Sequence, residues 1–157
     1  MTHRSVEHST IVLERTYDAS PARVFAAWSD KEALLRWGNP GEGWVTGMDR
    51  FDFRIGGASS SWFGPKDGDR FISETHYLDI VPGERIVSAG AMTRNGDFRA
   101  FVGMLTVEFH AVGRRCRMVM TEQGAFLDGH DIPANHEAGW NKMLDNLGEE
   151  LSSRAAA

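Results

Sequence analysis

The sequence has 157 residues, of which 41% are hydrophobic and 25% are charged, a composition that fits one soluble globular domain. The net charge of −5 argues against a nucleic-acid-binding face, which depends on a basic patch. No apolar run approaches the roughly 20 residues of a membrane-spanning helix. Residues 1–10 lack the apolar stretch of a signal peptide, and the lone Cys116 cannot form an internal disulfide. We therefore expect a cytoplasmic protein.

One strand and two short helices are predicted in the first quarter of the chain. Apolar and polar residues alternate over 11–17, which is the period-two pattern of a strand. The Ser-Pro pair at 20–21 supplies an N-cap and a first helical residue for a helix that continues to Trp28. A second helix is predicted to begin at residue 29 or 30 and to end at Trp37, where Gly38 follows.

The middle of the chain is predicted to be a series of antiparallel strands. Period-two alternation dominates up to Glu122, and clusters of turn residues interrupt it. The strands are expected over residues 44–55, 59–63, 70–80, 85–92, 98–110 and 115–122. A loop over 124–133 then leads to a long amphipathic helix over 133–151, whose apolar stripe consists of Trp140, Met143, Leu144, Leu147 and Leu151.

This order of elements predicts an α+β fold with a curved antiparallel sheet of about six to seven strands. The domain is expected over residues 11–151, between tails at 1–10 and 152–157. The long C-terminal helix must cover the concave side of the sheet, because its apolar stripe needs a partner. One helix cannot fill the concave side of so long a sheet. We therefore expect an internal cavity, which is the usual shape of a small-molecule site.

Six short motifs, taken in order, resemble the Hsp90-ATPase-activator-like (AHSA1-like) branch of the START/Bet v 1-like (SRPBCC) superfamily. They are Arg15, residues 20–28 (SPARVFAAW), Arg36-Trp37, residues 52–57 (DFRIGG), residues 80–87 (IVPGERIV), and residues 137–140 (EAGW) with Leu144 and Leu147. The resemblance implies a helix-grip fold, in which the sheet and the long helix often enclose an apolar pocket. It implies no common activity, because members of one fold differ in function.

The aromatic content gives the candidate ligand-binding residues. Five tryptophans and nine phenylalanines are many for this length, and apolar walls with a few polar anchors are typical of small-molecule sites. The candidate wall residues are Trp37, Trp44, Trp62, Phe63, Phe71, Phe101, Met104, Phe126, Trp140 and Met143. The candidate polar anchors are Arg54, Glu74, His76 and Arg99. For any single aromatic residue, filling the core is the simpler interpretation.

Motifs for catalysis or metal binding are weak. The serines at 59–61 lack a nucleophile elbow and an assigned base, and His130 and His136 are six residues apart rather than three or four. His136, near the start of the long helix, is placed at the mouth of the expected pocket. Gly139 is interpreted as a point where this helix approaches its neighbour closely. We expect no cofactor and no metal, and we assign no catalytic residue.

The leading hypothesis is a non-enzymatic domain that binds a small apolar or amphipathic molecule. A cyclase- or hydrolase-type enzyme is the alternative, with Glu74 and His76 converging in the same cavity. The resemblance also raises a chaperone-interaction module. However, the eukaryotic co-chaperones have an additional N-terminal domain, so we do not expect a chaperone contact. A homodimer, formed through a strand edge or the helical insert, is left open.

Overall fold

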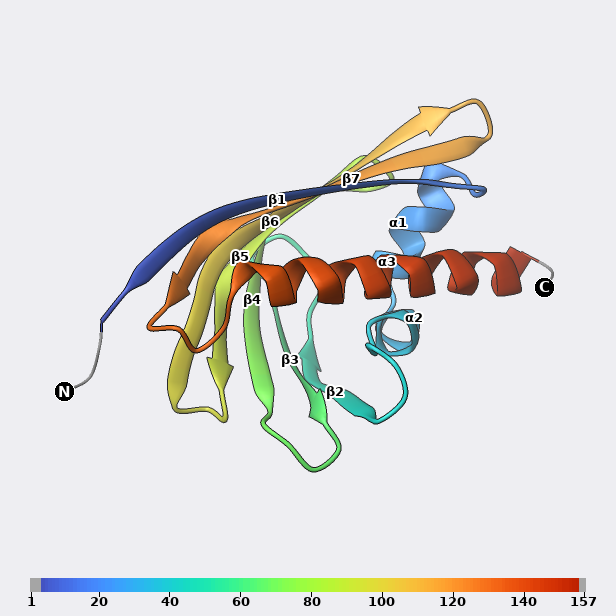
Figure 1. Cartoon of the computed structure of the whole chain (residues 1–157). Helices are drawn as coiled ribbons and strands as arrows, with labels where there is room; N and C mark the ends of the chain where they lie inside the picture. Colours follow the sequence, from blue (N-terminus) through green and yellow to red (C-terminus); the bar gives the residue numbers. More distant parts are fainter. Residues whose placement is uncertain (1–3, 156–157) are drawn as a thin grey trace.

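The computed structural model describes residues 4–155 as seven strands and three helices (Figure 1). The strands are β1 (Val6–Tyr17), β2 (Trp44–Phe51), β3 (Ala58–Pro65), β4 (Phe71–Val81), β5 (Arg85–Arg94), β6 (Phe98–Val112) and β7 (Arg115–Leu127). The helices are α1 (Pro21–Ser29), α2 (Lys31–Trp37) and α3 (Pro133–Ala155). None of the described helices is both long enough and apolar enough to cross a membrane.

The strands form one antiparallel sheet in the order β1-β7-β6-β5-β4-β3-β2. The sheet curves around α3, and α1 and α2 lie near the C-terminal half of that helix (Figure 1). We term the concave side, which α3 crosses, the inner face and the opposite side the outer face. The predicted α+β helix-grip architecture is therefore confirmed, and β1 pairs with the last strand, β7.

Several predicted boundaries were wrong. β1 begins at Val6 rather than at Ile11, because residues 6–10 pair with the end of β7, which itself runs on to Leu127. The alternation is hidden there, since residues 6–10 are polar apart from Val6. At the other end, α3 continues past Leu151 to Ala155. The predicted tails are thus partly strand and partly helix, and their remainders at 1–3 and 156–157 lie outside the described residues.

The two short helices begin where the capping residues predict. The Ser20 side chain accepts a hydrogen bond from the Arg23 backbone at 3.2 Å, and Asp30 accepts one from Ala33 at 3.2 Å. Each cap satisfies a backbone N–H that the first helical turn leaves free. The buried faces of these helices then place Trp28 against Trp37, with ring centres 4.8 Å apart.

The main hydrophobic core lies between α3, α1 and the inner face of β1, β6 and β7. Its most deeply buried side chains are Met118, Met120, Leu144 and Leu147. The Tyr17 hydroxyl donates to the Leu144 carbonyl at 2.7 Å and so ties α3 to β1. A second, smaller cluster contains Met92, Ala100, Phe101 and Phe126.

Candidate functional site

A carboxylate stands at an inward position of β7 where the strand pattern calls for an apolar residue. Met118, Met120 and Phe126 point to the inner face and are buried. Glu122 lies between them in the same alternation and is only 8% exposed. Burial of a carboxylate is costly unless charged or polar groups compensate it. Its hydrogen-bond partners, His136 and Trp140, both come from α3.

His136, in the first turns of α3, lies between two carboxylates. Its Nδ1 is 2.7 Å from Oε1 of Glu122, and its Nε2 is 2.8 Å from Oδ2 of Asp131. The second oxygen of Glu122 accepts a hydrogen bond from Trp140 Nε1 at 3.0 Å, and the second oxygen of Asp131 accepts from Asn135 Nδ2, also at 3.0 Å. Every carboxylate oxygen therefore has a donor. We term Glu122, Asp131 and His136 the inner polar cluster.

The charge state of His136 follows from these contacts. Burial by itself would lower the pKa of the imidazole, but the hydrogen bonds to Asp131 and Glu122 outweigh it and raise the pKa to about 9. Burial likewise disfavours the Asp131 carboxylate, yet the hydrogen bonds from His136 and Asn135 leave its pKa lowered. At neutral pH His136 is therefore an imidazolium between Asp131 and Glu122.

Aromatic rings enclose the imidazolium. The ring centres of Phe101 and Phe126 each lie 4.7 Å from that of His136. The Phe101 ring covers Gly103 and Gly124, where an added Cβ would overlap with it. The two glycines therefore make the room in which the ring can reach His136. Water is largely excluded, which strengthens the ion pairs.

This arrangement favours an anchoring role over acid–base catalysis. Both ring nitrogens of His136 are engaged by carboxylates, so no free lone pair is available to take a proton at neutral pH. A metal would need converging ligands, and the part of the chain that the structure describes contains no group of three or more suitable side chains. The cluster instead fixes the N-terminal end of α3 against β7.

The inner face brings together seven of the sequence-predicted site residues. Phe63 and Phe71 stack with ring centres 5.4 Å apart and pack, half-buried, against the smaller core cluster. The ring centres of Trp44 and Phe63 are 6.2 Å apart. The remaining inner-face members are Phe101 and Phe126 on the strands and Trp140 and Met143 on α3.

The other predicted site residues lie elsewhere. Glu74, His76, Trp62 and Met104 alternate with inward residues and point to the outer face, where Glu74 accepts a hydrogen bond from Ser60 at 2.8 Å. Both Glu74 and His76 are exposed, so they do not converge in a cavity and the enzyme hypothesis loses its candidates.

Three further members also lie outside the space between the inner face and α3. Trp37 is 2% exposed and donates to the Ala27 carbonyl at 2.9 Å, so it belongs to the core between the short helices. Arg99 is exposed near the β5–β6 turn, and exposed Arg54 pairs with Asp52 at 3.0 Å. Their positions could not be assigned from sequence, because a period-two pattern does not say which face is concave.

Small side chains line the inner face of β3, β4 and β5 beside the aromatic pair. This inner strip consists of Ser59, Ser61, Ser73, Thr75, Ser88 and Gly90, which are paired with one another or adjacent across the strands. Ser59 and Ser88 are buried, whereas Ser61, Ser73 and Thr75 are half-buried although they face α3. Short side chains therefore leave this part of the inner face incompletely covered.

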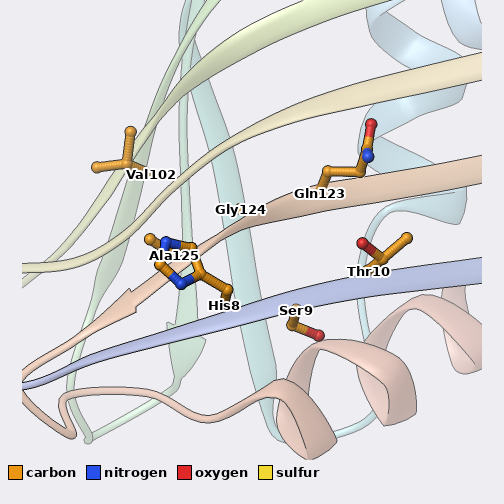
Figure 2. Close-up of a pocket in the computed structure, with 7 residues that line it drawn as sticks. All are labelled: His8, Ser9, Thr10, Val102, Gln123, Gly124 and Ala125. Atoms are coloured by element: carbon orange, nitrogen blue, oxygen red, sulfur yellow. The ribbon is translucent and has the colours of Figure 1, made fainter.

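Two surface depressions lie outside this space. One is on the outer face, where Val102, Gln123 and Ala125 are among its lining residues (Figure 2). The other lies between α2 and α3, beside Arg36 and Asn146. Both are open to solvent.

Glu122 and Asp131 were not predicted as site residues from the sequence. A signal for Glu122 existed, since it replaces an apolar residue in the inward series that includes Met118 and Met120. Asp131 gave a weaker signal, as an acidic residue two positions before the first residue of a helix. Their convergence on His136 depends on where the loop after β7 directs the chain, and one sequence does not contain that information.

Comparisons with known proteins agree with this fold. The family model described as "Activator of Hsp90 ATPase homolog 1-like protein" matches residues 18–152. A structure from Rhizobium leguminosarum is 38% identical, covers 97% of this chain and 99% of its own, and has a TM-score of 0.86. A structure from Rhizobium loti is 39% identical, covers 93% of this chain and 99% of its own, and has a TM-score of 0.83. A structure from Chromobacterium violaceum is 29% identical, covers 90% of this chain and 96% of its own, and has a TM-score of 0.80. No curated protein matches the sequence.

Proposed function

The chain belongs to the family of activator of Hsp90 ATPase homolog 1-like proteins, and we propose that it binds a small apolar or amphipathic molecule between the inner face and α3. The fold is compatible with such a role, since a curved sheet gripping a helix has a concave side available to a ligand. The aromatic pair Phe63 and Phe71 contacts the apolar part of the molecule, and the inner strip provides the room.

The incomplete cover of the inner strip is the observation that carries this proposal. Ser61, Ser73 and Thr75 face α3 but stay half-buried, and the half-buried rings of Phe63 and Phe71 lie next to them. Small hydroxyl side chains beside exposed aromatic surface give both apolar contact and hydrogen-bonding groups. The inner polar cluster fixes the start of α3 beside this surface, so that one wall of the site is rigid.

Filling the inner strip tests the proposal. Native mass spectrometry and tryptophan quenching with lauric acid, naringenin and an aromatic polyketide identify a ligand of the unmodified protein. Thr75→Trp places a large ring on the inner face and is expected to weaken binding of that ligand at least tenfold, about 1.4 kcal/mol. Ser73→Leu, a smaller intrusion on the same strand, is expected to weaken it in the same direction.

Glu74→Trp is the matched control, because the neighbouring side chain on the same strand points to the outer face. It should leave the affinity unchanged, and circular dichroism establishes that all three variants are folded. The proposal fails if none of the three probes binds the unmodified protein, or if Thr75→Trp and Glu74→Trp bind equally well.

A further inference from the structure

The outer face has an uncharged centre. Outward residues alternate with inward ones along β1, β7, β6 and β5. Each strand contributes three of them, within residues 8–12, 121–125, 102–106 and 87–91. None of these side chains is Asp, Glu, Lys or Arg, in a chain of which 25% of the residues are charged. We term these outward residues the outer block.

Apolar side chains of the outer block are open to solvent. Val12 is 59% exposed, Val102 is 42% exposed and Met104 is 38% exposed. Beside Val102 the surface is hollowed over Gly124, and the side chains of Val102 and Gln123 stand on the two strands there (Figure 2). Val102 and Met104 are successive outward residues of β6, and exposed apolar side chains that lie together are typical of an interaction site.

Charged residues border one end of the outer block. In the row next to it, Glu14 on β1, Glu108 on β6 and Arg85 on β5 are in register with Val119 on β7, and Arg117 lies one outward position further along β7. All four charged residues are outward, since Leu13, Met118, Val107 and Ile86, one position away on the same strands, are buried. The row therefore has an acid at its β1 edge and a base at its β5 edge.

We propose that the outer block is the contact face of a dimer of this chain. The two sheets pack face to face around a twofold axis that runs parallel to the strands, between β7 and β6. Such an axis places β1 of one copy over β5 of the other, and β7 over β6, because a twofold contact uses the same patch on both copies. Packed sheets in proteins adopt this aligned arrangement about 10 Å apart.

The two ends of this row are complementary under this axis. Glu14 faces Arg85 of the second copy, and this pairing occurs twice, whereas Glu108 faces the uncharged Val119 of the second copy. An unrelated partner would need its own matching charges at both edges, whereas a second copy supplies them automatically. The placement of Glu14 and Arg85 at opposite edges of the face therefore favours this chain as its occupant.

The area of the face is sufficient for a weak dimer. With strands about 4.8 Å apart and same-face residues about 6.8 Å apart, the outer block and its two flanking rows cover about 19 Å by 34 Å. Two copies then bury about 1,300 Å², at the lower end of specific interfaces. We expect association in the micromolar range.

Charge exchange at the row tests the dimer. Sedimentation velocity of the full chain at about 1 to 200 μM should show a concentration-dependent dimer. Glu14→Arg places two arginines opposite each other at both symmetry-related sites, and Arg85→Glu does the same with two glutamates. Each substitution should therefore weaken dimerisation at least tenfold. The Glu14→Arg/Arg85→Glu double variant restores unlike pairs and should restore the dimer. The fold should persist, since the intrachain partners of both residues are exposed and such pairs add little stability.

Two further variants make the outcome decisive. Val102→Asp buries a charge near the axis and should give a monomer, whereas Glu149→Arg on the exposed side of α3 should leave dimerisation unchanged. A monomer at all concentrations overturns the proposal. So does a dimer that withstands both single charge exchanges, because its interface then lies elsewhere. A double variant that remains monomeric overturns the assigned axis.

Discussion

At the scale of single residues, Phe101 shows how two glycines position an aromatic ring beside a charged one. Gly103 and Gly124 pair directly across β6 and β7, and the Phe101 ring lies over both. The rings of Phe101, Phe126 and His136 are then in mutual contact, each pair of ring centres being 4.7 or 4.8 Å apart. Side chains at either glycine would displace Phe101 from the imidazolium and open the cluster to water.

Gly124→Ala is therefore expected to lower the free energy of unfolding by about 1 to 3 kcal/mol through overpacking. Gly139→Ala is the control, because no atom lies within 4 Å of a Cβ added there. That substitution should raise stability by about 0.5 to 1 kcal/mol, since alanine favours the helix. Urea unfolding measures both. Equal effects would mean that both the Phe101 ring and the Val102 carbonyl oxygen, which the added Cβ also meets, move aside freely.

The open space at Gly139 also corrects the interpretation made from sequence. A glycine next to Trp140 suggested a close approach of the helix to its neighbour. In the structure the glycine faces open space, so close packing does not require it there.

At the scale of elements, the inner polar cluster ties α3 to the sheet at the end opposite to Tyr17. Glu122 comes from β7, Asp131 from the loop between β7 and α3, and His136 from α3 itself. Removing one member of a buried ion pair leaves an uncompensated charge and typically costs about 3 to 5 kcal/mol. The N-terminal half of α3 should depend on this contact.

The stabilising effect of His136 is expected to disappear at alkaline pH. The pKa of the folded state, about 9, is above the ordinary value of 6.5. The contribution of the imidazolium is therefore complete below pH 6.5 and is lost as the pH rises through about 9. The shift corresponds to about 3 kcal/mol. His136→Gln, which does not titrate, should be destabilised at pH 6 and should lose most of this deficit relative to the unmodified protein at alkaline pH.

Urea unfolding at both pH values measures this difference. The variant should also exchange amide hydrogens faster in the first turns of α3. Glu137→Gln, an exposed neighbour, serves as the control and should behave like the unmodified protein. A stability difference that stays constant with pH would show that His136 does not carry the charge in the folded state.

The elements themselves could largely be predicted from sequence, because their signals are local. Ser20 and Asp30 mark helix starts through their own side chains, and the apolar stripe of α3 needs only its own period. The start of β1 was missed, since residues 6–10 acquire their strand structure from pairing with β7. The site was harder to predict. Glu74 and Glu122 both occupy alternating strand positions, and only knowledge of which face is concave distinguishes them.

At the scale of the whole molecule, the interior is divided unequally. The main core surrounds the middle and C-terminal part of α3, whereas Phe63, Phe71 and the His136 ring are half-buried cover of the smaller cluster. Regions with few buried apolar contacts open locally at lower free energy than the whole domain. The smaller cluster adjoins the proposed ligand surface, so this opening is where a ligand would enter.

Two methionine truncations should separate local from global opening. Met120→Ala, in the main core, is expected to cost about 2 to 5 kcal/mol and to accelerate the most slowly exchanging amides. It should leave amides near Phe101 unchanged, because Met120 stays packed while the smaller cluster opens. Met92→Ala removes a contact of the smaller cluster itself and should accelerate exchange in both places. Native-state hydrogen exchange distinguishes them. If Met120→Ala accelerates the amides near Phe101 as strongly as the slowest amides, the domain opens only as one unit.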